Sequence, residues 1–440
     1  MVLPDYILSC IQALENAGFA AYAVGGCVRD DCLGLTPHDF DLCTAALPEE
    51  TESIFANRRL VLAGKKHGTV GVVTEQGVVE ITTFRTEAGY ADNRHPDAVA
   101  FVTDIEMDLA RRDFTVNAMA YSPVRGFADP FGGRVDLQNR VLRAVGDPAT
   151  RFQEDSLRIL RGIRFAARFG LEIQPETENA MIACAPLMEN LARERVFDEL
   201  CKLLVYVTAE DLLRFAPILS QVIPELKPTI GFHQHSKHHA YDLFTHIAHV
   251  CGSVPPDMAQ RWAALLHDIG KVSTFTLDEQ GQGHFYGHAQ ESAQMADTIL
   301  RRLKAPNDLR EQVVFLIDKH MTKLEPEKKR LRRWIGKFGP EAMEQLLLLQ
   351  ESDMGSKGTG KPENMEQFDQ LRALMQEIRE ENACLSLKDL AVNGHDLMAL
   401  GYSGKAIGQT LHRLLEQVLD EQLPNEKEAL LKFLQQEECL

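Results

Sequence analysis

The hydrophobic pattern of the chain changes near Asp147, and this change constrains the fold more than any other feature. Before it, helical segments alternate with short β-branched runs, and the runs at 69–74 and 78–84 flank a turn and predict a hairpin. After it the strand signal almost disappears and a helical period dominates, as over 155–169 and 181–204. The pattern predicts an α+β chain, with an α/β head followed by an all-helical body.

Length and composition narrow the class of protein. A chain of 440 residues suggests about three domains, and no stretch approaches the ~20 consecutive apolar residues of a membrane span. The first residues, MVLPDYILSC, lack a basic segment ahead of an apolar core, so we expect no secretion signal. The nine cysteines include no CxxC pair, which favours reduced thiols in a cytoplasmic protein over disulfides or a zinc ribbon.

The charge balance limits how the chain can bind nucleic acid. Lys and Arg number 47 against 64 Asp and Glu, for a net charge of −17. A uniformly acidic surface repels phosphates, so a nucleic-acid partner must be held by local basic patches.

Two acidic residues follow a glycine pair in the head. Gly25-Gly26 ends an apolar run and opens a helix-like segment, and the sequence HDFDL, which contains Asp39 and Asp41, comes next. On a strand, these two carboxylates would share a face and could hold two Mg²⁺ ions about 4 Å apart. Backbone amides at Gly26 could approach a triphosphate, with Arg29 as a charged clamp. The stretch predicts a metal-dependent nucleotidyl-transfer site, although either element alone is usually a plain turn.

Two neighbours of these aspartates are assigned less directly. Phe40, between them, is expected to point into the core. Glu80, in the next strand run, is expected to face solvent, and a third acidic group at the site is the alternative.

Three ordered motifs within residues 1–230 carry a family resemblance. They are GGCVRD with HDFDL, RRDFTVNAMA over 111–120, and RFQEDSLRILRGIRF over 151–165. Together they resemble the class II CCA-adding tRNA nucleotidyltransferases and the bacterial poly(A) polymerases, although His38 stands where the family often carries Lys. The resemblance implies a polymerase-β-like nucleotidyltransferase head. It also implies that Arg112 helps to hold the incoming nucleotide, while Asp113 orients neighbouring groups.

A charged stripe lies in the last of these motifs, where every third residue is Asp155, Arg158, Arg161 or Arg164. A carboxylate only accepts hydrogen bonds and a guanidinium only donates them. Asp155 and Arg158 therefore match C and A, whereas U and G present a carbonyl oxygen to the carboxylate. In a desolvated site this mismatch can lower the selection of U and G by a factor of up to ~10⁴. The resemblance assigns base recognition to this pair and places the last two arginines nearer the phosphates. A solvated, ion-paired helix face is the alternative.

Six residues of the body are spaced as in the HD phosphohydrolase fold: His246, His267, Asp268, His288, His320 and Asp353. The run LLHDIGK over 265–271 resembles the central helix of that fold. Adjacent His267 and Asp268, with His246 and Asp353 from other helices, can bind one divalent metal and activate water. His288 and His320 could extend the site to a second ion or a phosphate, and a purely scaffolding domain is the alternative.

These features divide the chain into a nucleotidyltransferase head at 1–145, a helical neck for base and RNA binding at 146–230, an HD domain at 231–355 and a tRNA-binding helical tail at 356–440. The stretch 355–362 is expected to be a flexible linker or an exposed loop, and 85–96 matches the flexible loop of the family. Glu194, Arg195 and Glu199 are expected to support the head–neck junction.

The basic run 328–333, with Trp334 and Lys337, is expected to contact tRNA phosphates or to form a solvated helix face. In the tail, Gly404-Lys405 could meet a phosphate.

The leading prediction is an enzyme that adds C, C and A to the 3′ end of tRNA from CTP and ATP with Mg²⁺, releasing pyrophosphate. The alternatives are a poly(A) polymerase or an enzyme that adds only CC or only A. Two alternatives from other classes of protein rank lower: an HD phosphohydrolase with a degenerate head, and an RNA-binding module without catalysis. The lack of a basic tail and the presence of the 85–96 loop favour full CCA addition. No membrane partner is expected, and the pattern carries no signal for an oligomeric state.

Overall fold

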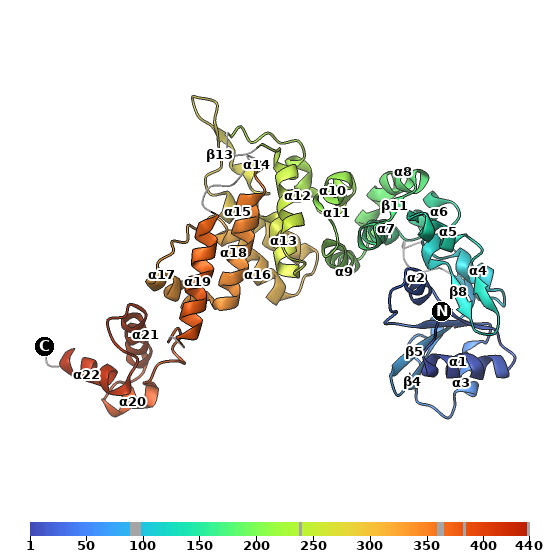
Figure 1. Cartoon of the computed structure of the whole chain (residues 1–440), viewed down its shortest axis with the longest axis horizontal. Helices are drawn as coiled ribbons and strands as arrows, with labels where there is room; N and C mark the ends of the chain where they lie inside the picture. The colour runs from blue at the N-terminus through green and yellow to red at the C-terminus, as the bar shows by residue number, and fades with distance from the viewer. Residues whose placement is uncertain (89–97, 237–239, 359–364, 382–383, 438–440) are drawn as a thin grey trace. The chain divides into compact units, whose positions relative to one another are not determined.

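The computed structural model describes residues 1–88, 98–236, 240–358, 365–381 and 384–437 (Figure 1). These residues form two compact units, Met1–Lys227 and Pro228–Leu440. In the described residues, no helix has both the length and the apolar character to cross a membrane.

The first unit is built on a mixed sheet with the strand order β3-β4-β5-β2-β1-β8-β9. Its strands are β1 (Ala21–Val24), β2 (Asp41–Thr44), β3 (Leu60–Val61), β4 (Thr69–Thr74), β5 (Gly77–Thr83), β8 (Ala120–Ser122) and β9 (Gly126–Ala128). Central β1 is fully buried and pairs antiparallel with β2 and β8, while β2 pairs parallel with β5. A separate ribbon joins β6 (Arg85–Ala88) to β7 (Ala98–Phe101).

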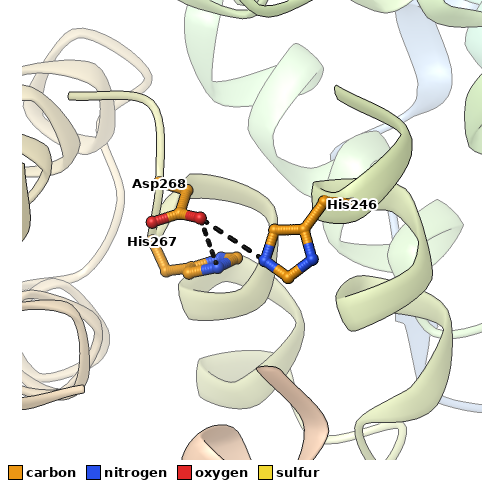
Figure 2. Close-up of side chains that lie close together, drawn as sticks. All are labelled: His246, His267 and Asp268. Atoms are coloured by element: carbon orange, nitrogen blue, oxygen red, sulfur yellow. Dashed lines mark ion pairs between the residues drawn. The ribbon is translucent and has the colours of Figure 1, made fainter. Parts of the chain in front are cut away.

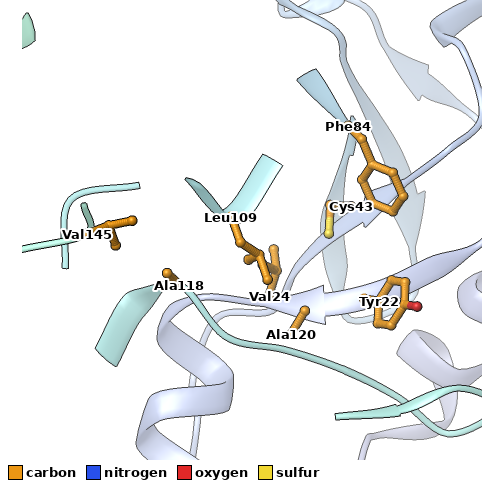
Figure 3. Close-up of a cluster of buried hydrophobic side chains, with 8 residues drawn as sticks. All are labelled: Tyr22, Val24, Cys43, Phe84, Leu109, Ala118, Ala120 and Val145. Atoms are coloured by element: carbon orange, nitrogen blue, oxygen red, sulfur yellow. The ribbon is translucent and has the colours of Figure 1, made fainter. Parts of the chain in front are cut away.

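A cluster of apolar side chains seals one side of this sheet (Figure 3). Tyr22 and Val24 of β1 pack there with Cys43 of β2 and with Leu109 of α4 (Ile105–Ala110). The other helices of the head are α1 (Asp5–Asn16), α2 (Gly26–Cys32), α3 (Pro48–Ile54) and α5 (Gly133–Gln138), with short 3₁₀ turns η1 (Lys65–His67) and η2 (Thr115–Asn117). The core fixes β1 and β2 and so fixes the loops at their ends.

Helices follow the sheet in the same unit. Asp147 caps α6 (Pro148–Glu154) by accepting a hydrogen bond from the Thr150 amide, and Pro148 occupies the first turn, where a missing amide costs nothing. After it come α7 (Leu157–Phe169), α8 (Pro175–Cys184), η3 (Ala185–Asn190), α9 (Arg193–Leu204), α10 (Ala209–Arg214) and α11 (Ala216–Val222). The 3₁₀ helix η4 (Pro224–Thr229) contains the boundary between the two units. A two-residue parallel pair, β10 (Val141–Leu142) with β11 (Glu172–Ile173), ties this segment to the head.

The second unit is helical apart from the short pair β12 (Thr276–Leu277) and β13 (Gly283–His284) among its described residues. Its helices are α12 (Leu243–Ser253), α13 (Met258–Leu266), α14 (Lys271–Thr274), α15 (His288–Arg302), α16 (Asn307–Lys319), α17 (Lys328–Phe338), α18 (Pro340–Gly355), α19 (Glu366–Glu380), α20 (Gly394–Ala399), α21 (Lys405–Leu419) and α22 (Lys427–Glu437). The last three enclose a small apolar core around Leu397, Leu414 and Leu430.

The predicted α+β class, the hairpin (β4 with β5) and the strand–Gly-Gly–helix order are confirmed. Four local expectations were wrong. β2 begins at Asp41, so Asp39 lies in the preceding loop, and Phe40 is only partly buried, with its ring edge-on to Tyr6. Helix α7 begins at Leu157, after Asp155. The predicted helix over 181–204 is interrupted at η3, where Pro186 lacks an amide for the helical hydrogen bonds.

Two expected flexible segments fall partly outside the described residues. The loop expected at 85–96 begins as strand β6 and then enters 89–97, which are not described. The linker expected at 355–362 begins at the last residue of α18, and its residues 359–362 are not described.

Candidate active site and metal centre

Three carboxylates gather where β2 begins. Leu42 pairs with Ile81 in parallel register, which brings Asp41 beside Glu80 of β5, and Asp39 lies just before β2. The pKa of Asp41 is raised, first because protein surrounds its carboxylate and then because Glu80 and Asp39 add negative charge, while Arg112 acts in the opposite direction. Oxygen ligands that repel one another suit a hard divalent cation, so this group fits a divalent metal. Glu80 thus faces solvent, as expected, and is also a third acidic group here.

The Gly-Gly turn lies at the same end of the β1–β2 pair, because Val24, the residue before it, is the register partner of Asp41. Gly25 has φ 76° and ψ −120°, and its amide donates to the Met119 carbonyl at 3.0 Å. A Cβ on residue 25 would meet Arg112 Nη1 at 3.0 Å. The positive φ favours glycine at this position, and Gly26 begins α2 directly afterwards.

Arg112 lies between the glycine turn and the carboxylates. Its Nη1 is against Gly25, and its charge acts on Asp41. Its Nε is buried and has no hydrogen-bond partner. A buried unpaired donor is costly, so this guanidinium is suited to an anionic ligand such as a phosphate.

Arg29 is placed differently from the clamp that the sequence suggested. It is buried; its Nη1 donates to Asn117 Oδ1 at 2.5 Å and its Nε to Asp30 Oδ1 at 2.9 Å. The guanidinium also lies over the Phe169 ring, 4.4 Å from its centroid. With these contacts Arg29 joins α2 to α7 and is turned into the protein.

Asp155 lies in the turn between α6 and α7, with φ −147° and ψ 99°, so it does not continue the helical stripe of Arg158. Its Oδ1 accepts from the Leu157 amide at 3.1 Å and its Oδ2 from Arg195 Nη2 at 2.8 Å. Each carboxylate oxygen has a second lone pair. These contacts orient the acceptor and leave it able to receive one more donor.

Arg158, the other residue expected to read bases, is also held by neighbours. Nη1 donates to Glu154 Oε2 at 2.7 Å and to the Arg151 carbonyl at 3.2 Å. Nη2 donates to the Arg111 carbonyl at 3.0 Å, which ties α7 to the residue before Arg112. The sequence interpretation missed Glu154, although it lies four residues before Arg158 on a helical spacing.

The last two arginines of the stripe form ion pairs with distant carboxylates. Arg161 Nε donates to Asp113 Oδ2 at 2.8 Å, and Arg164 is buried against Glu199. Burial alone would raise the pKa of Asp113, but the charge of Arg161 and hydrogen bonds from Asn117 and Arg161 lower the pKa to about 2. The structure therefore does not bring Arg164 to the carboxylate group, and it pairs Arg161 inside the unit.

The six residues of the predicted HD pattern come together in the second unit. His246 Nε2 lies 3.4 Å from Asp268 Oδ2 and 3.0 Å from Asp353 Oδ1, and His267 Nε2 lies 3.2 Å from Asp268 Oδ2 (Figure 2). On the other side, Asp268 Oδ1 is 3.3 Å from His288 Nε2 and 3.7 Å from His320 Nε2. Asp268 is shared by the two halves of the cluster. The residues come from α12, the turn after α13, α18, and the ends of α15 and α16.

The side chains of this cluster are oriented like metal ligands. Nδ1 of each histidine contacts a backbone carbonyl: Ser356 for His246, Ala264 for His267, Phe285 for His288 and Ile317 for His320. Such contacts fix the tautomer that leaves Nε2 free to bind a metal. Nε2 of His267 and Nε2 of His288 are buried and lie 3.2 and 3.3 Å from the two buried oxygens of Asp268. The donor set therefore fits a divalent metal that accepts mixed nitrogen and oxygen ligands.

The close packing of histidines and aspartates in this cluster changes the pKa of His246. Burial lowers the pKa of His246, but hydrogen bonds to Asp268 and Asp353 outweigh it and raise the pKa to about 9. Lys271, which opens α14, places Nζ 2.7 Å from Asp268 Oδ2 and donates to Gln234 Oε1 at 3.2 Å. The sequence analysis placed this lysine in the run over 265–271 but gave it no contact with the metal-ligand residues.

Comparison with known proteins places the chain in a family. It is 35% identical over 433 residues to a CCA-adding enzyme of Streptococcus suis, a match that covers 97% of this chain and 95% of the relative. The chain belongs to the CCA-adding enzyme family. Family models match as "Poly A polymerase head domain" over 21–143, "Probable RNA and SrmB- binding site of polymerase A" over 170–230 and "tRNA nucleotidyltransferase domain 2 putative" over 279–434.

Solved structures agree with this family. The Bacillus stearothermophilus CCA-adding enzyme in complex with CTP is 28% identical, with a TM-score of 0.70 over 99% of this chain and 98% of that one. The Thermotoga maritima CCA-adding enzyme complexed with tRNA shares the fold, with a TM-score of 0.57 and 20% identity over 99% of this chain and 96% of that one. Nucleotidyltransferases of this family use a divalent metal.

The basic run of this CCA-adding enzyme is largely neutralised by its own carboxylates. It lies on α17, where Lys328 pairs with Glu377 of α19 and with Glu381, the residue after that helix, and Arg332 pairs with Glu381 and Glu421. Arg333 and Lys329 pair with Asp420. The side chains of Lys329, Arg330 and Arg333 are still largely exposed, so the solvated helix face and the phosphate-binding face expected from the sequence both stay predictions. At the tail, Gly404 precedes α21 as predicted.

Proposed function

We propose that this protein adds C, C and A to the 3′ end of tRNA without a nucleic-acid template, using CTP and ATP with Mg²⁺. The observation that carries the proposal is the continuity of the first unit: the carboxylates at β2 adjoin Arg112, and the residue before Arg112 accepts a hydrogen bond from Arg158. The membership in the CCA-adding enzyme family supports it. We also propose that tRNA lacking its 3′ end is the partner and that the enzyme acts in the cytoplasm.

Each part of the site has a role in the transfer. Asp39 and Asp41 would hold Mg²⁺, which, when bound, neutralises phosphate charge and favours the ionised 3′-hydroxyl. The 3′-oxygen of the RNA forms a bond to the α-phosphorus, and the bond from that phosphorus to the β-bridging oxygen breaks, releasing pyrophosphate. Arg112, together with the amide of Gly26, would hold the triphosphate in line for this attack.

Base choice would come from Asp155 and Arg158. The carboxylate can accept from the amino group of C or A, and the guanidinium can donate to the ring acceptors of the same edge. Arg195 and Glu154 hold the pair in place, so little freedom is lost when a base binds. The Bacillus stearothermophilus CCA-adding enzyme forms a complex with CTP, and this is consistent with the assignment.

The test is incubation with tRNA lacking CCA and with each nucleoside triphosphate alone and in pairs. We expect two additions with CTP alone, none with UTP or GTP, and three with CTP and ATP together. Long adenosine tails would identify a poly(A) polymerase, and products that stop at CC with both nucleotides would identify a CC-adding enzyme.

A second activity is proposed for the second unit, a metal-dependent phosphohydrolase of the HD type. It is supported by the cluster of ligand-type side chains around Asp268, in which Nε2 of His267 and of His288 is buried. The measurement is metal content after purification, together with hydrolysis of a generic phosphate ester with Mn²⁺ or Ni²⁺. A protein that retains no metal after dialysis against either ion would contradict this proposal and leave CCA addition untouched.

A further inference from the structure

Asp108 on α4 is a buried carboxylate to which the sequence interpretation gave no role. It has no exposed surface. Its Oδ1 accepts from Nε and Nη2 of Arg111, both at 3.0 Å, and from the backbone amide of Arg85 at 3.2 Å. Its Oδ2 faces Nη2 of Arg112 at 3.5 Å. Burying an ionised carboxylate costs desolvation free energy unless opposite charge and hydrogen bonds compensate for it, and here two arginines and an amide do so.

The position of Asp108 in the sequence explains how one carboxylate reaches both arginines. Arg111 and Arg112 lie three and four residues after it, the separations at which side chains meet on a helix. Asp108 thereby contacts the guanidinium groups of both arginines. One of them, Arg112, is the group that lies against Gly25 and beside Asp41.

The hydrogen bond from the Arg85 amide links Asp108 to a second element. Arg85 begins β6, which pairs with β7 and so returns the chain to the start of α4. The same carboxylate therefore joins the base of the β6–β7 ribbon to the tandem arginines. A change at this ribbon would be felt at Arg112 through a single side chain.

We propose that Asp108 is a positioning residue, which aims Arg112 at the triphosphate of the incoming nucleotide without touching the nucleotide. The inference rests on the proposed function, since it needs Arg112 to bind the triphosphate. In the orientation that Arg112 adopts, Nη2 faces Asp108 while Nη1 faces Gly25, so one placement of the guanidinium serves both contacts. Without the carboxylate, the guanidinium has no reason to keep that orientation, and Asp41 becomes a competing partner.

The experiment measures KM and kcat for CTP with tRNA lacking CCA in Asp108→Asn, Arg112→Ala and the double variant. Asp108→Asn should raise KM for CTP about tenfold, the usual size of a charge-assisted contact, and should add no further increase in the Arg112→Ala background. Glu106→Gln, an exposed acid on the same helix, is the matched control and should keep the wild-type KM.

Other outcomes separate the inference from the function on which it rests. An unchanged KM in Asp108→Asn, or an equal increase in both backgrounds, would overturn the positioning role. An unchanged KM in Arg112→Ala would instead refute the triphosphate role of Arg112 itself. If Asp108→Asn fails to fold by its melting temperature, Asp108→Glu replaces it: the carboxylate displaced by one methylene should give an intermediate KM, and a wild-type KM would overturn the inference.

Discussion

Arg158 donates a hydrogen bond from Nη2 to the backbone carbonyl of Arg111 at 3.0 Å. The next residue, Arg112, lies against Gly25 and acts on the charge of Asp41. One peptide unit therefore separates the arginine expected to read the base from the arginine expected to hold the triphosphate. This hydrogen bond joins helix α7 to the segment that carries Arg112.

The carboxylates at β2 give the first prediction. Asp41→Ala and Asp39→Ala should each abolish measurable nucleotide incorporation, because the oxygen ligands that hold Mg²⁺ are lost. Binding of tRNA, measured by gel retardation, should be largely unchanged. Glu75→Ala, an exposed acid on the β4–β5 turn, is the control. Incorporation near the wild-type rate in both aspartate variants would contradict the metal-binding role.

Glu80 provides a test of the third acidic group. Its charge helps to raise the pKa of Asp41, so Glu80→Gln should weaken the local attraction for a divalent cation. We expect a reduction in rate on the order of tenfold at limiting Mg²⁺, with partial recovery at high Mg²⁺. A titration of rate against Mg²⁺ that overlays the wild-type curve would show that Glu80 has no part in the site.

Asp155 should control base selectivity. Asp155→Ala removes the acceptor for the amino groups of C and A, so the discrimination against UTP should fall by roughly 10²-fold or more. The measurement is competition between CTP and UTP for incorporation. Asp198→Ala, exposed on α9, is the control and should retain full selectivity. Selectivity unchanged in Asp155→Ala would refute base recognition by this carboxylate.

Local sequence patterns predicted most of the fold and part of the site. The hairpin and the glycine turn follow from side-chain alternation and turn residues, which act over a few positions. The prediction that Asp39 lies on a strand was wrong. Strand β1 ends at Val24, which pairs with Asp41, and the chain turns at Gly25, so β1 offers no partner to the residues before Asp41.

Long-range pairing explains the other differences. Arg161 and Asp113 are 48 residues apart, and Arg164 and Glu199 are 35 apart, so no helical spacing reveals either pair. The cluster around Asp268 was predicted, in contrast, because histidines and aspartates in an HD pattern are recognisable by residue type before their contacts are known.

The metal centre of the second unit should be separable from CCA addition. His267→Ala removes one of the ligand nitrogens around Asp268, so bound divalent metal, measured by plasma emission after dialysis, should fall sharply while nucleotide incorporation stays at the wild-type rate. His412→Ala is a matched control, because that exposed histidine also contacts a backbone carbonyl through Nδ1. Metal content equal to that of the wild type in His267→Ala would exclude this histidine as a ligand.

The ion pair between Asp113 and Arg161 should make stability depend on pH. The pKa of Asp113 is lowered from 3.8 to about 2 in the folded state, so the folded state favours the ionised carboxylate by about 2 kcal/mol at neutral pH. That contribution is complete above about pH 4 and is lost as the pH falls toward 2. Asp113→Asn should therefore lower the unfolding temperature of the first unit at pH 7, by a margin that shrinks toward pH 3. Calorimetry is the suitable measurement, because Trp262 and Trp334 both lie in the second unit and their fluorescence does not report on the first.

The control Asp198→Asn should leave the unfolding temperature unchanged at pH 7 and at pH 3. If the difference in unfolding temperature between Asp113→Asn and the wild type is the same at both pH values, the lost stability is not electrostatic.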